Sequence, residues 1–275
     1  MVSLVLASRL ARAKFAGADL AGHARGGAAL VMRNAYVHRA DLSVLVSGFA
    51  EPLLYLLSFG VGMGVLVGRI PYQGGTIAYP VFVAPAMLAA AAMNGAVTES
   101  TFNVYAKLKF MKLYDAVLAT PVTPLGIAIG EIGWALLRST LYSACFVAVM
   151  SVMGLAPSWW SLLALPAAML IGFAFSALGM AFTTFMRTWQ DFDYINVAVF
   201  LLLLFSATFA PIEAYPGWLG LLVEATPLYH DVALVRGLTT GVVSTGLLWH
   251  VGYLVVLSGL GLAVTASRMR KLLQP

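Results

Sequence analysis

Six long apolar stretches decide what kind of fold this chain can adopt. They cover residues 43–67, 78–101, 124–153, 161–186, 193–213 and 246–267. A helix needs about 20 apolar residues to cross the hydrocarbon core of a bilayer, so we predict an all-α integral membrane protein with six transmembrane helices. Charged residues make up only 10% of the chain, against roughly 25% in soluble domains. This composition excludes a soluble enzyme, a disordered chain and a nucleic-acid-binding protein.

Basic residues are distributed unevenly between the two sides that these spans define. Thirteen of the 16 lysines and arginines fall before the first span, in the second and fourth connections, or in the C-terminal tail. Only Arg69 and Arg236 fall on the opposite side, and Arg138 lies within the third span. Cytoplasmic loops of membrane proteins carry the excess of lysine and arginine. The asymmetry therefore predicts a multi-pass protein with both termini in the cytoplasm.

Residues 1–42 carry too many charges to cross a membrane. They intersperse basic residues with short apolar groups such as Leu30-Val-Met and Tyr36-Val. This mixture favours an amphipathic helix at the cytoplasmic interface, with its basic groups near anionic lipid. A purely structural anchor is the alternative interpretation. The chain thus divides into an N-terminal segment, residues 1–42, and a six-helix transmembrane domain, residues 43–275.

Three charged residues fall inside the predicted spans, where charge is costly and is usually paired or functional. Glu51 lies in the first span, and Glu131 and Arg138 lie in the third. Glu131 and Arg138 share a helix face but stand about 10 Å apart along the axis. Each therefore needs a partner from another helix. A structural network of ion pairs is one interpretation, and a relay for protons or substrate is the other.

Glycines recur every four residues toward the outer end of the first span. They are Gly60, Gly64 and Gly68. Small residues at this spacing let two helix backbones approach closely. The pattern favours a packing face or a dimer face over a ligand site.

The connection after the second span combines basic and apolar residues. It favours a helix through Leu118, which Thr120 and Pro121 bring to an end. A short amphipathic cytoplasmic helix that exposes an apolar face needs a groove in a partner protein. Contact with lipid headgroups is the alternative. The residues concerned are Lys107, Lys109 and Lys112, with Leu108, Phe110, Met111, Leu113 and Tyr114 beside them.

The stretch after the fifth span is too apolar for a free loop and too rich in proline to span a membrane. Pro211, Pro216 and Pro227 interrupt it. Short re-entrant or interfacial helices on the outer face fit this composition best, because non-helical backbone at membrane depth must be covered by protein or line a cavity.

The chain carries none of the common catalytic motifs. It has no phosphate-binding loop of the G-x-x-x-x-G-K-[ST] type, no H-E-x-x-H and no G-x-S-x-G. Its only cysteine is Cys145, and its four histidines have no metal-ligand spacing. Asp191 and Asp193 form a D-x-D pair, which we interpret mainly as part of a polar turn between two spans. We therefore predict no catalytic residue and no metal site.

Several segments together resemble a known transporter family. They are Arg33-Asn34, Glu51-Pro-Leu-Leu-Tyr-Leu-Leu57, Tyr114-Asp-Ala-Val-Leu-Ala-Thr-Pro-Val122, Gly130-Glu131, Pro227-Leu-Tyr and Leu234-Val-Arg-Gly237. From about residue 30 onward the chain resembles the membrane permeases of type-2 ABC transporters (ABC-2). Within that family it is similar to the NodJ-like group, which is associated with export of lipo-oligosaccharides, with closely similar permeases linked to drugs.

The resemblance implies an assembly in a bacterial plasma membrane. Two permease copies, here a homodimer, pair with two separate ABC ATPase subunits. These subunits bind ATP and Mg, so this chain needs no cofactor. The cargo is a lipid-linked saccharide, a glycolipid or an amphipathic drug. The coupling helix that contacts the ATPase corresponds to about residues 109–121, with Lys109, Lys112, Leu113, Tyr114, Asp115, Leu118, Thr120 and Pro121 as its contact residues.

Two other functions remain open from the residues alone. A proton-coupled secondary transporter of a hydrophobic compound would use Glu51, Glu131 and Arg138. The chain lacks the two matching halves that inverted repeats would give. A membrane-embedded glycosyl or prenyl transferase would need Asp191 and Asp193 to hold a metal and a donor.

Overall fold

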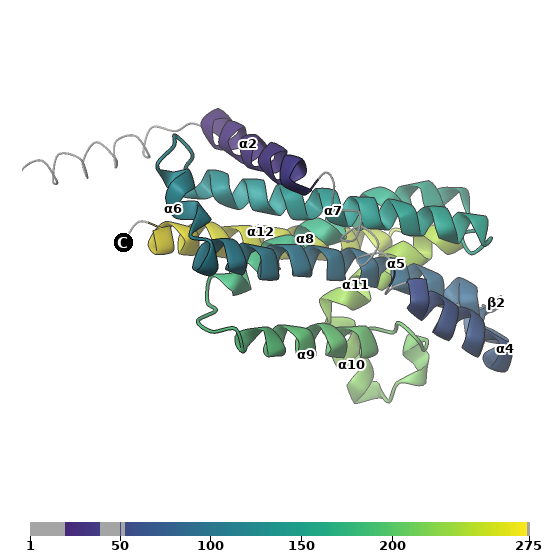
Figure 1. Cartoon of the computed structure of the whole chain (residues 1–275). Helices are drawn as coiled ribbons and strands as arrows, with labels where there is room; N and C mark the ends of the chain where they lie inside the picture. The colour runs from purple at the N-terminus through teal and green to yellow at the C-terminus, as the bar shows by residue number, and fades with distance from the viewer. Residues whose placement is uncertain (1–19, 39–49, 51–52, 274–275) are drawn as a thin grey trace, which may run out of the picture.

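The computed structural model describes residues 20–38, 50 and 53–273 of the chain. Glu51, predicted as an intramembrane charge, and the first part of the N-terminal segment lie outside these residues. The described part is helical apart from one two-stranded hairpin and the connecting turns. The prediction of a mainly α-helical chain is therefore confirmed for this part (Figure 1).

Four helices are long and apolar enough to cross a membrane among the described residues. They are Tyr79–Phe110, Pro124–Val152, Trp159–Thr183 and Leu247–Leu273. The first comprises α5 (Tyr79–Thr98) and two π-helical segments, η2 (Glu99–Asn103) and η3 (Ala106–Phe110). The others are α7 (Pro124–Val152), η4 (Trp159–Leu163) with α8 (Ala164–Thr183), and α12 (Leu247–Leu273). They match the second, third, fourth and sixth predicted spans.

The first and fifth predicted spans are not confirmed as full-length crossings. Helix α9 (Asp191–Leu204) has 14 residues, about 21 Å of helix, against a hydrocarbon core of about 30 Å. The predicted range 193–213 is wrong at its C-terminal end because bends follow Leu204 and Ala207 adopts a φ of 52°. In the first span the structure describes η1 (Leu56–Gly62) and α4 (Met63–Val67).

A short antiparallel hairpin connects α4 to α5. It pairs β1 (Arg69–Tyr72) with β2 (Gly75–Ala78), in a register that sets Tyr72 opposite Gly75. Gln73 and Gly74 between the strands both have positive φ, as the tight hairpin turns that match strand twist require. Gly68 ends α4 with a φ of 70°, so it serves as a turn residue.

Prolines begin the short elements that follow α9. Pro211 precedes η5 (Ile212–Ala214), Pro216 precedes α10 (Gly217–Ala225), and Pro227 is the first residue of α11 (Pro227–Thr240). The Thr226 hydroxyl accepts a hydrogen bond from the Tyr229 backbone N–H at 3.3 Å and caps α11. The predicted short helices are therefore present, and α11 packs against α5, α8 and α12.

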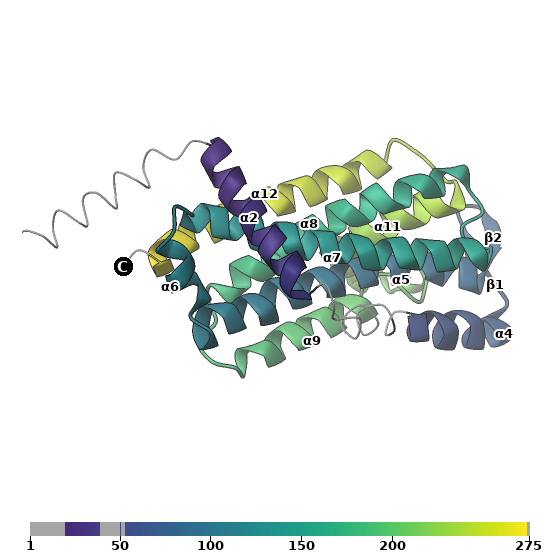
Figure 2. The same cartoon turned by 45° about the horizontal axis from the view of Figure 1, so that its top comes forward.

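Helix α2 (Leu20–His38) crosses α7 at close range. A Cβ atom added to Gly130 would lie 2.7 Å from the Leu30 Cβ and 2.9 Å from the Gly27 carbonyl oxygen, so the two backbones touch because residue 130 is glycine. His23 Nδ1 lies 2.7 Å from Thr123 Oγ1, the hydroxyl that caps the N-terminus of α7. Figure 2 shows α2 lying across α7.

The elements divide between two ends of the helix bundle. Helix α6 (Leu113–Leu118) and the C-terminal end of α12 lie at one end, and the hairpin lies at the other (Figures 1 and 2). The turn between α7 and α8 contacts the end of α11, where the Ser158 N–H donates to the Thr239 carbonyl at 3.3 Å.

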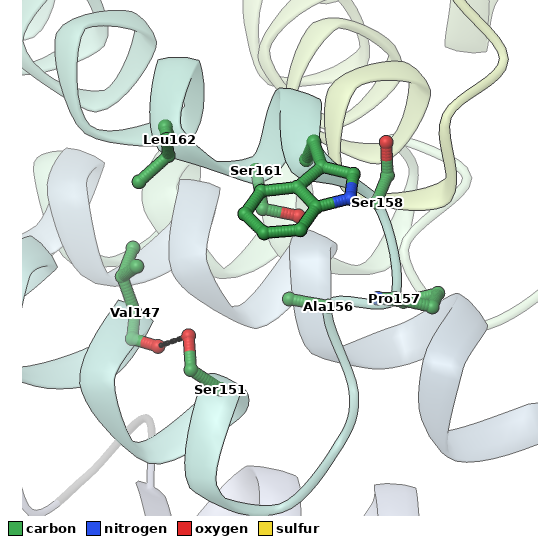
Figure 3. A pocket seen from close by; sticks show the side chains of 8 residues that line it. Val147, Ser151, Ala156, Pro157, Ser158, Ser161 and Leu162 are labelled. Atoms are coloured by element: carbon green, nitrogen blue, oxygen red, sulfur yellow. Dashed lines mark hydrogen bonds between the residues drawn. The ribbon is translucent and has the colours of Figure 1, made fainter.

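A shallow hollow of about 310 Å³ lies in this turn (Figure 3). Ser151 at its edge donates to the Val147 carbonyl at 2.8 Å. Trp159 lines the hollow and is 90% exposed, as expected for a tryptophan at the headgroup level.

Candidate functional site

Helix α7 places Glu131 where three helices meet. The carboxylate is 2% exposed, and its Oε2 accepts hydrogen bonds from Lys107 Nζ at 2.6 Å and from Asn34 Nδ2 at 3.2 Å. Lys107 lies in η3 at the end of the second span, and Asn34 lies on α2. Glu131 thus has the partners on other helices that its position in the span required.

Tyr114 adds the short helix α6 to this cluster. Its side chain is 1% exposed. Burial raises the pKa of the Tyr114 hydroxyl well above its usual value, and the neighbouring Glu131 carboxylate raises it further. The Tyr114 hydroxyl and Glu131 Oε1 each have no hydrogen-bond partner among the described residues. We call Asn34, Lys107, Tyr114 and Glu131 the polar junction.

A second buried ion pair lies further along the same two spans. Arg138 of α7 pairs with Glu99 of η2 and also donates to the Tyr142 hydroxyl. Asn103 Nδ2 donates to the other Glu99 oxygen at 2.6 Å. Arg138 therefore also finds its partner on another helix.

The two ion pairs cross between the second and third spans with opposite polarity. The span that begins at Tyr79 supplies an acid, Glu99, and then a base, Lys107, whereas α7 supplies Glu131 and then Arg138. Because the two helices are antiparallel, each acid faces a base. Removing one partner of a buried pair leaves an uncompensated charge, which costs about 3–5 kcal/mol. Glu99 and Lys107, which the second span supplies, lie in the π-helical segments η2 and η3, and such segments are frequent at functional sites.

The predicted coupling helix is shorter than its predicted range. Lys109 belongs to the end of the second span, and Lys112 has a φ of 47° that breaks the helix before α6 begins. Helix α6 ends at Leu118, and Thr120 and Pro121 follow in a turn. The expectation of one helix from residue 109 to 121 is therefore wrong.

The same segment separates into a buried and an exposed set. Tyr114 is buried, contrary to its expected place on an exposed apolar face, because it fills the space beside Glu131. Leu113 and Leu118 are half-buried. The exposed residues are Lys109, Phe110, Met111, Lys112, Asp115, Thr120 and Pro121. We call this set the coupling surface.

The glycines of the first span do not form one packing face within the chain. A Cβ at Gly64 would lie 3.0 Å from the Pro80 side chain, so only this glycine approaches another element. A Cβ at Gly60 would meet Leu56 of the same helix, and one at Gly68 would meet nothing within 4 Å.

The D-x-D pair has a structural use. Asp191 Oδ2 accepts hydrogen bonds from the Thr188 and Arg187 backbone N–H groups, at 3.0 and 2.7 Å. These bonds lower the pKa of the exposed Asp191 carboxyl and hold the turn before α9. Asp193 is exposed and forms no ion pair within the described part of the chain.

An aromatic cluster holds this turn against the end of the second span. Phe102 stacks on Phe192 with ring centroids 4.0 Å apart, and Trp189 meets Tyr105, Phe110 and Phe192. These residues could not be grouped from the sequence, because Trp189 and Phe192 lie about 80 positions from their partners Phe102, Tyr105 and Phe110.

The partners Glu99 and Lys107 were also missed. The spacing could have indicated them: an acid precedes a base by eight residues on the second span and by seven residues on the third. Antiparallel helices with such spacing can pair both ends at once.

Comparison with known proteins defines the class. Residues 28–239 match the ABC-2 type transporter family, which includes both spans of the polar junction. The chain belongs to this family of membrane transporters.

Comparison with individual proteins shows which members of the family this chain is similar to. The chain is 32% identical over 230 residues to nodulation protein J of Rhizobium leguminosarum bv. trifolii, covering 82% of this chain and 86% of that protein. It is 29% identical over 241 residues to nodulation protein J of Rhizobium meliloti, covering 86% and 89%. The expected NodJ-like resemblance is thereby confirmed.

Proposed function

We propose that this chain is the membrane permease subunit of an ATP-driven exporter. It works as a homodimer in a bacterial plasma membrane, with both termini in the cytoplasm. Two ABC ATPase subunits contact it from the cytoplasm and bind the ATP and Mg. The cargo is a lipid-linked saccharide, a glycolipid or an amphipathic drug. Membership of the ABC-2 family and similarity to nodulation protein J support this proposal.

One observation carries the proposal: the coupling surface is joined directly to the polar junction. Met111 is 68% exposed, and Tyr114, three residues later, is 1% exposed and lies beside Glu131. A partner that binds the exposed basic and apolar residues is thus linked to the third span through Tyr114. Asn34 and Lys107 extend this contact to α2 and to the second span.

The proposed coupling follows from these contacts. ATP binding moves the ATPase subunits, and the coupling surface moves with them. Because Tyr114 is packed at the polar junction, α6 shifts α7 and α2 together. The buried ion pairs keep the second and third spans in register as they tilt, since separating either pair would expose a charge to hydrocarbon.

A hollow of about 250 Å³ between α5 and α9 supports a route for an amphiphilic cargo. Asn94, Thr98 and Asn196 supply polar groups to its lining, and Tyr55 and Phe200 supply aromatic surface. A path with both kinds of group suits a cargo with a polar and an apolar part.

Charge reversal on the coupling surface tests the proposal. In Lys109→Glu/Lys112→Glu, we expect the permease to remain in the membrane, because both side chains are exposed. Copurification of the ATPase subunit and ATP-dependent export into inverted vesicles should both fall about tenfold or more, because charge complementarity across the interface is replaced by repulsion.

The matched control is Arg270→Glu/Lys271→Glu. It makes the same change in net charge on exposed residues at the end of α12, and it should keep both activities. Unchanged ATPase binding and export in the first variant would contradict the proposal. Export that persists without ATP and responds to a proton gradient would instead favour the proton-coupled transporter.

A further inference from the structure

Helix α11 carries a buried acid and a buried base at adjacent positions. Asp231 is 0% exposed and His230 is 6% exposed. They lie in the first half of α11, which has 14 residues and is not one of the four long spans. Neither side chain belongs to the polar junction or to the coupling surface. The proposed coupling to an ATPase therefore makes no use of the proton that each of them can bind.

Asp231 has no partner for a negative charge. Neither of its carboxyl oxygens has a hydrogen bond to the described residues, and no lysine or arginine among those residues forms an ion pair with it. An ionised carboxylate in such surroundings loses its hydration without compensation. Burial accordingly raises the pKa of the Asp231 carboxyl well above its usual value. Asp231 is therefore held in its protonated, uncharged form while α11 is packed in the bundle.

His230 is held uncharged by a second histidine. Its Nδ1 lies 2.7 Å from Nδ1 of His250 on α12. Two nitrogens that face each other at this distance share one proton, because one must donate and the other must accept. A proton on both would leave two donors and two positive charges facing each other. Burial, together with the neighbouring His250 ring, lowers the pKa of His230 to about 4 from its usual 6.5.

The elements packed against α11 bring few other titratable groups to this place. On α12, Tyr253 stacks on the His230 ring with centroids 3.8 Å apart and interacts electrostatically with Asp231. Helix α5 carries only Tyr79, and η4 and α8 carry none. Helix α9 carries its own within its first four residues, where it meets the end of the second span. The other groups nearby interact with Tyr229, and they are Tyr72, Glu213, Glu224 and Arg236. Within the described part of the chain, none of them forms an ion pair with His230 or Asp231.

His250 connects the buried pair to solvent. It is half-buried and lines a hollow of about 240 Å³ near the hairpin. Gln73, Ser244 and Gly246 line the same hollow and are exposed. Water therefore has a route to the contact between the two histidines that does not cross the apolar core.

We propose that α11 acts as a proton switch, in which Asp231 holds the proton while the helix is packed and His230 takes it when the helix opens to water. On opening, the O–H bond of Asp231 breaks and an N–H bond forms on His230, with the entering water as the carrier. Between pH 3.8 and 6.5, the ordinary pKa values of the two side chains, water favours the proton on histidine. The packed form is uncharged and suits an apolar environment, whereas the open form carries a carboxylate and an imidazolium and requires hydration.

Infrared spectroscopy tests the packed form. The purified full chain is held at neutral pH in dodecyl maltoside, which contains no ester carbonyl. We expect the carbonyl stretch of a protonated carboxyl group, and Asp231→Asn should remove the contribution of one such group. Asp193→Asn, at an exposed aspartate, should leave the band unchanged. Circular dichroism checks the folding of both variants. An unchanged band in Asp231→Asn would show that Asp231 is ionised in the packed form and would overturn the inference.

Hydrogen exchange at the amides of α11 tests the open form. Helix α8 serves as the internal reference, because it carries no titratable residue. In His230→Asn/His250→Asn, two amides replace the histidine contact, and opening releases the proton of Asp231. Exchange, corrected for its intrinsic pH dependence, should then become faster as the pH rises, by up to about tenfold per pH unit. In Asp231→Asn, opening lets histidine take up a proton. Exchange should then become faster as the pH falls from 6.5 toward 4.

The switch requires pH dependences of opposite sign in these two variants. The same sign in both, or a lack of pH dependence in either variant, would overturn the inference. The measurements need neither an ATPase subunit nor a cargo. A failure of ATP-dependent export would therefore count against the proposed function alone and would leave the proton switch in place.

Discussion

Individual buried charges in this protein are held by specific partners. Glu131 accepts from both Lys107 and Asn34, and Arg138 pairs with Glu99. Such pairs gain little over apolar residues of the same shape, but they are costly to break. Here the ion pairs fix the register of two helices, because a slip of one helical turn between the second and third spans would separate both pairs at once.

Single and double substitutions at the polar junction separate pairing from packing. Glu131→Ala should lower the stability of the purified chain by about 3–5 kcal/mol, because Lys107 is left buried without a counter-ion. Lys107→Met/Glu131→Met should recover most of that loss, because no charge remains. Thermal unfolding in detergent measures both. Equal destabilisation by the single and double variants would show that the ion pair is not what Glu131 contributes.

Elements in this chain are joined at points of close backbone contact. Helix α2 is the clearest case, since Gly27 and Gly130 bring it onto α7, and its Asn34 then reaches Glu131. Helix α6 is the opposite case. It has only six residues, too few to be stable alone in water, and its position depends on the burial of Tyr114.

A pair of glycine substitutions tests the close contact. Gly130→Ala should destabilise the chain by about 1–3 kcal/mol, because the added Cβ overpacks the crossing with α2. It should also make α2 more accessible to limited proteolysis. Gly259→Ala should be neutral or stabilising by up to about 1 kcal/mol, because a Cβ there meets nothing within 4 Å and alanine favours helix. Similar effects from both substitutions would mean that α2 is not packed closely on α7.

At the scale of the molecule, α6 and the hairpin lie at opposite ends of the helix bundle. The coupling surface and the polar junction lie near α6, and Arg236 lines a hollow beside Tyr72 and Gln73 of the hairpin. The second and third spans and α12 connect these ends. One span links the two ends by hydrogen bonds, because the span that carries Lys107 also supplies the Phe82 carbonyl that Arg236 binds.

Thiol labelling tests this orientation in the membrane. Cys145 is the only cysteine, and Cys145→Ala provides a background without thiols. In that background Thr76→Cys, on the hairpin, should react with an impermeant maleimide in intact cells. Met111→Cys, on the coupling surface, should react only after the membrane is opened. The reverse pattern would invert the topology and remove the basis for an ATPase contact at α6.

The class of protein and the positions of four spans could be predicted from the amino-acid sequence, because a long apolar stretch has few alternatives to a membrane helix. It also placed the short elements after α9, since each proline there begins a new element. The need for partners at Glu131 and Arg138 could be predicted from the cost of charge at depth.

The partners of those charges and the burial of Tyr114 became clear from the packing of the helices. Both depend on contacts between segments that are distant in the chain, which local composition does not encode. The length of α9 is a further example. The stretch after Leu204 is still mostly apolar, but the chain leaves the helix there, and Arg236 of α11 binds the carbonyl oxygens of Ala207 and Thr208. These bonds satisfy the backbone groups that a longer helix would otherwise have to pair.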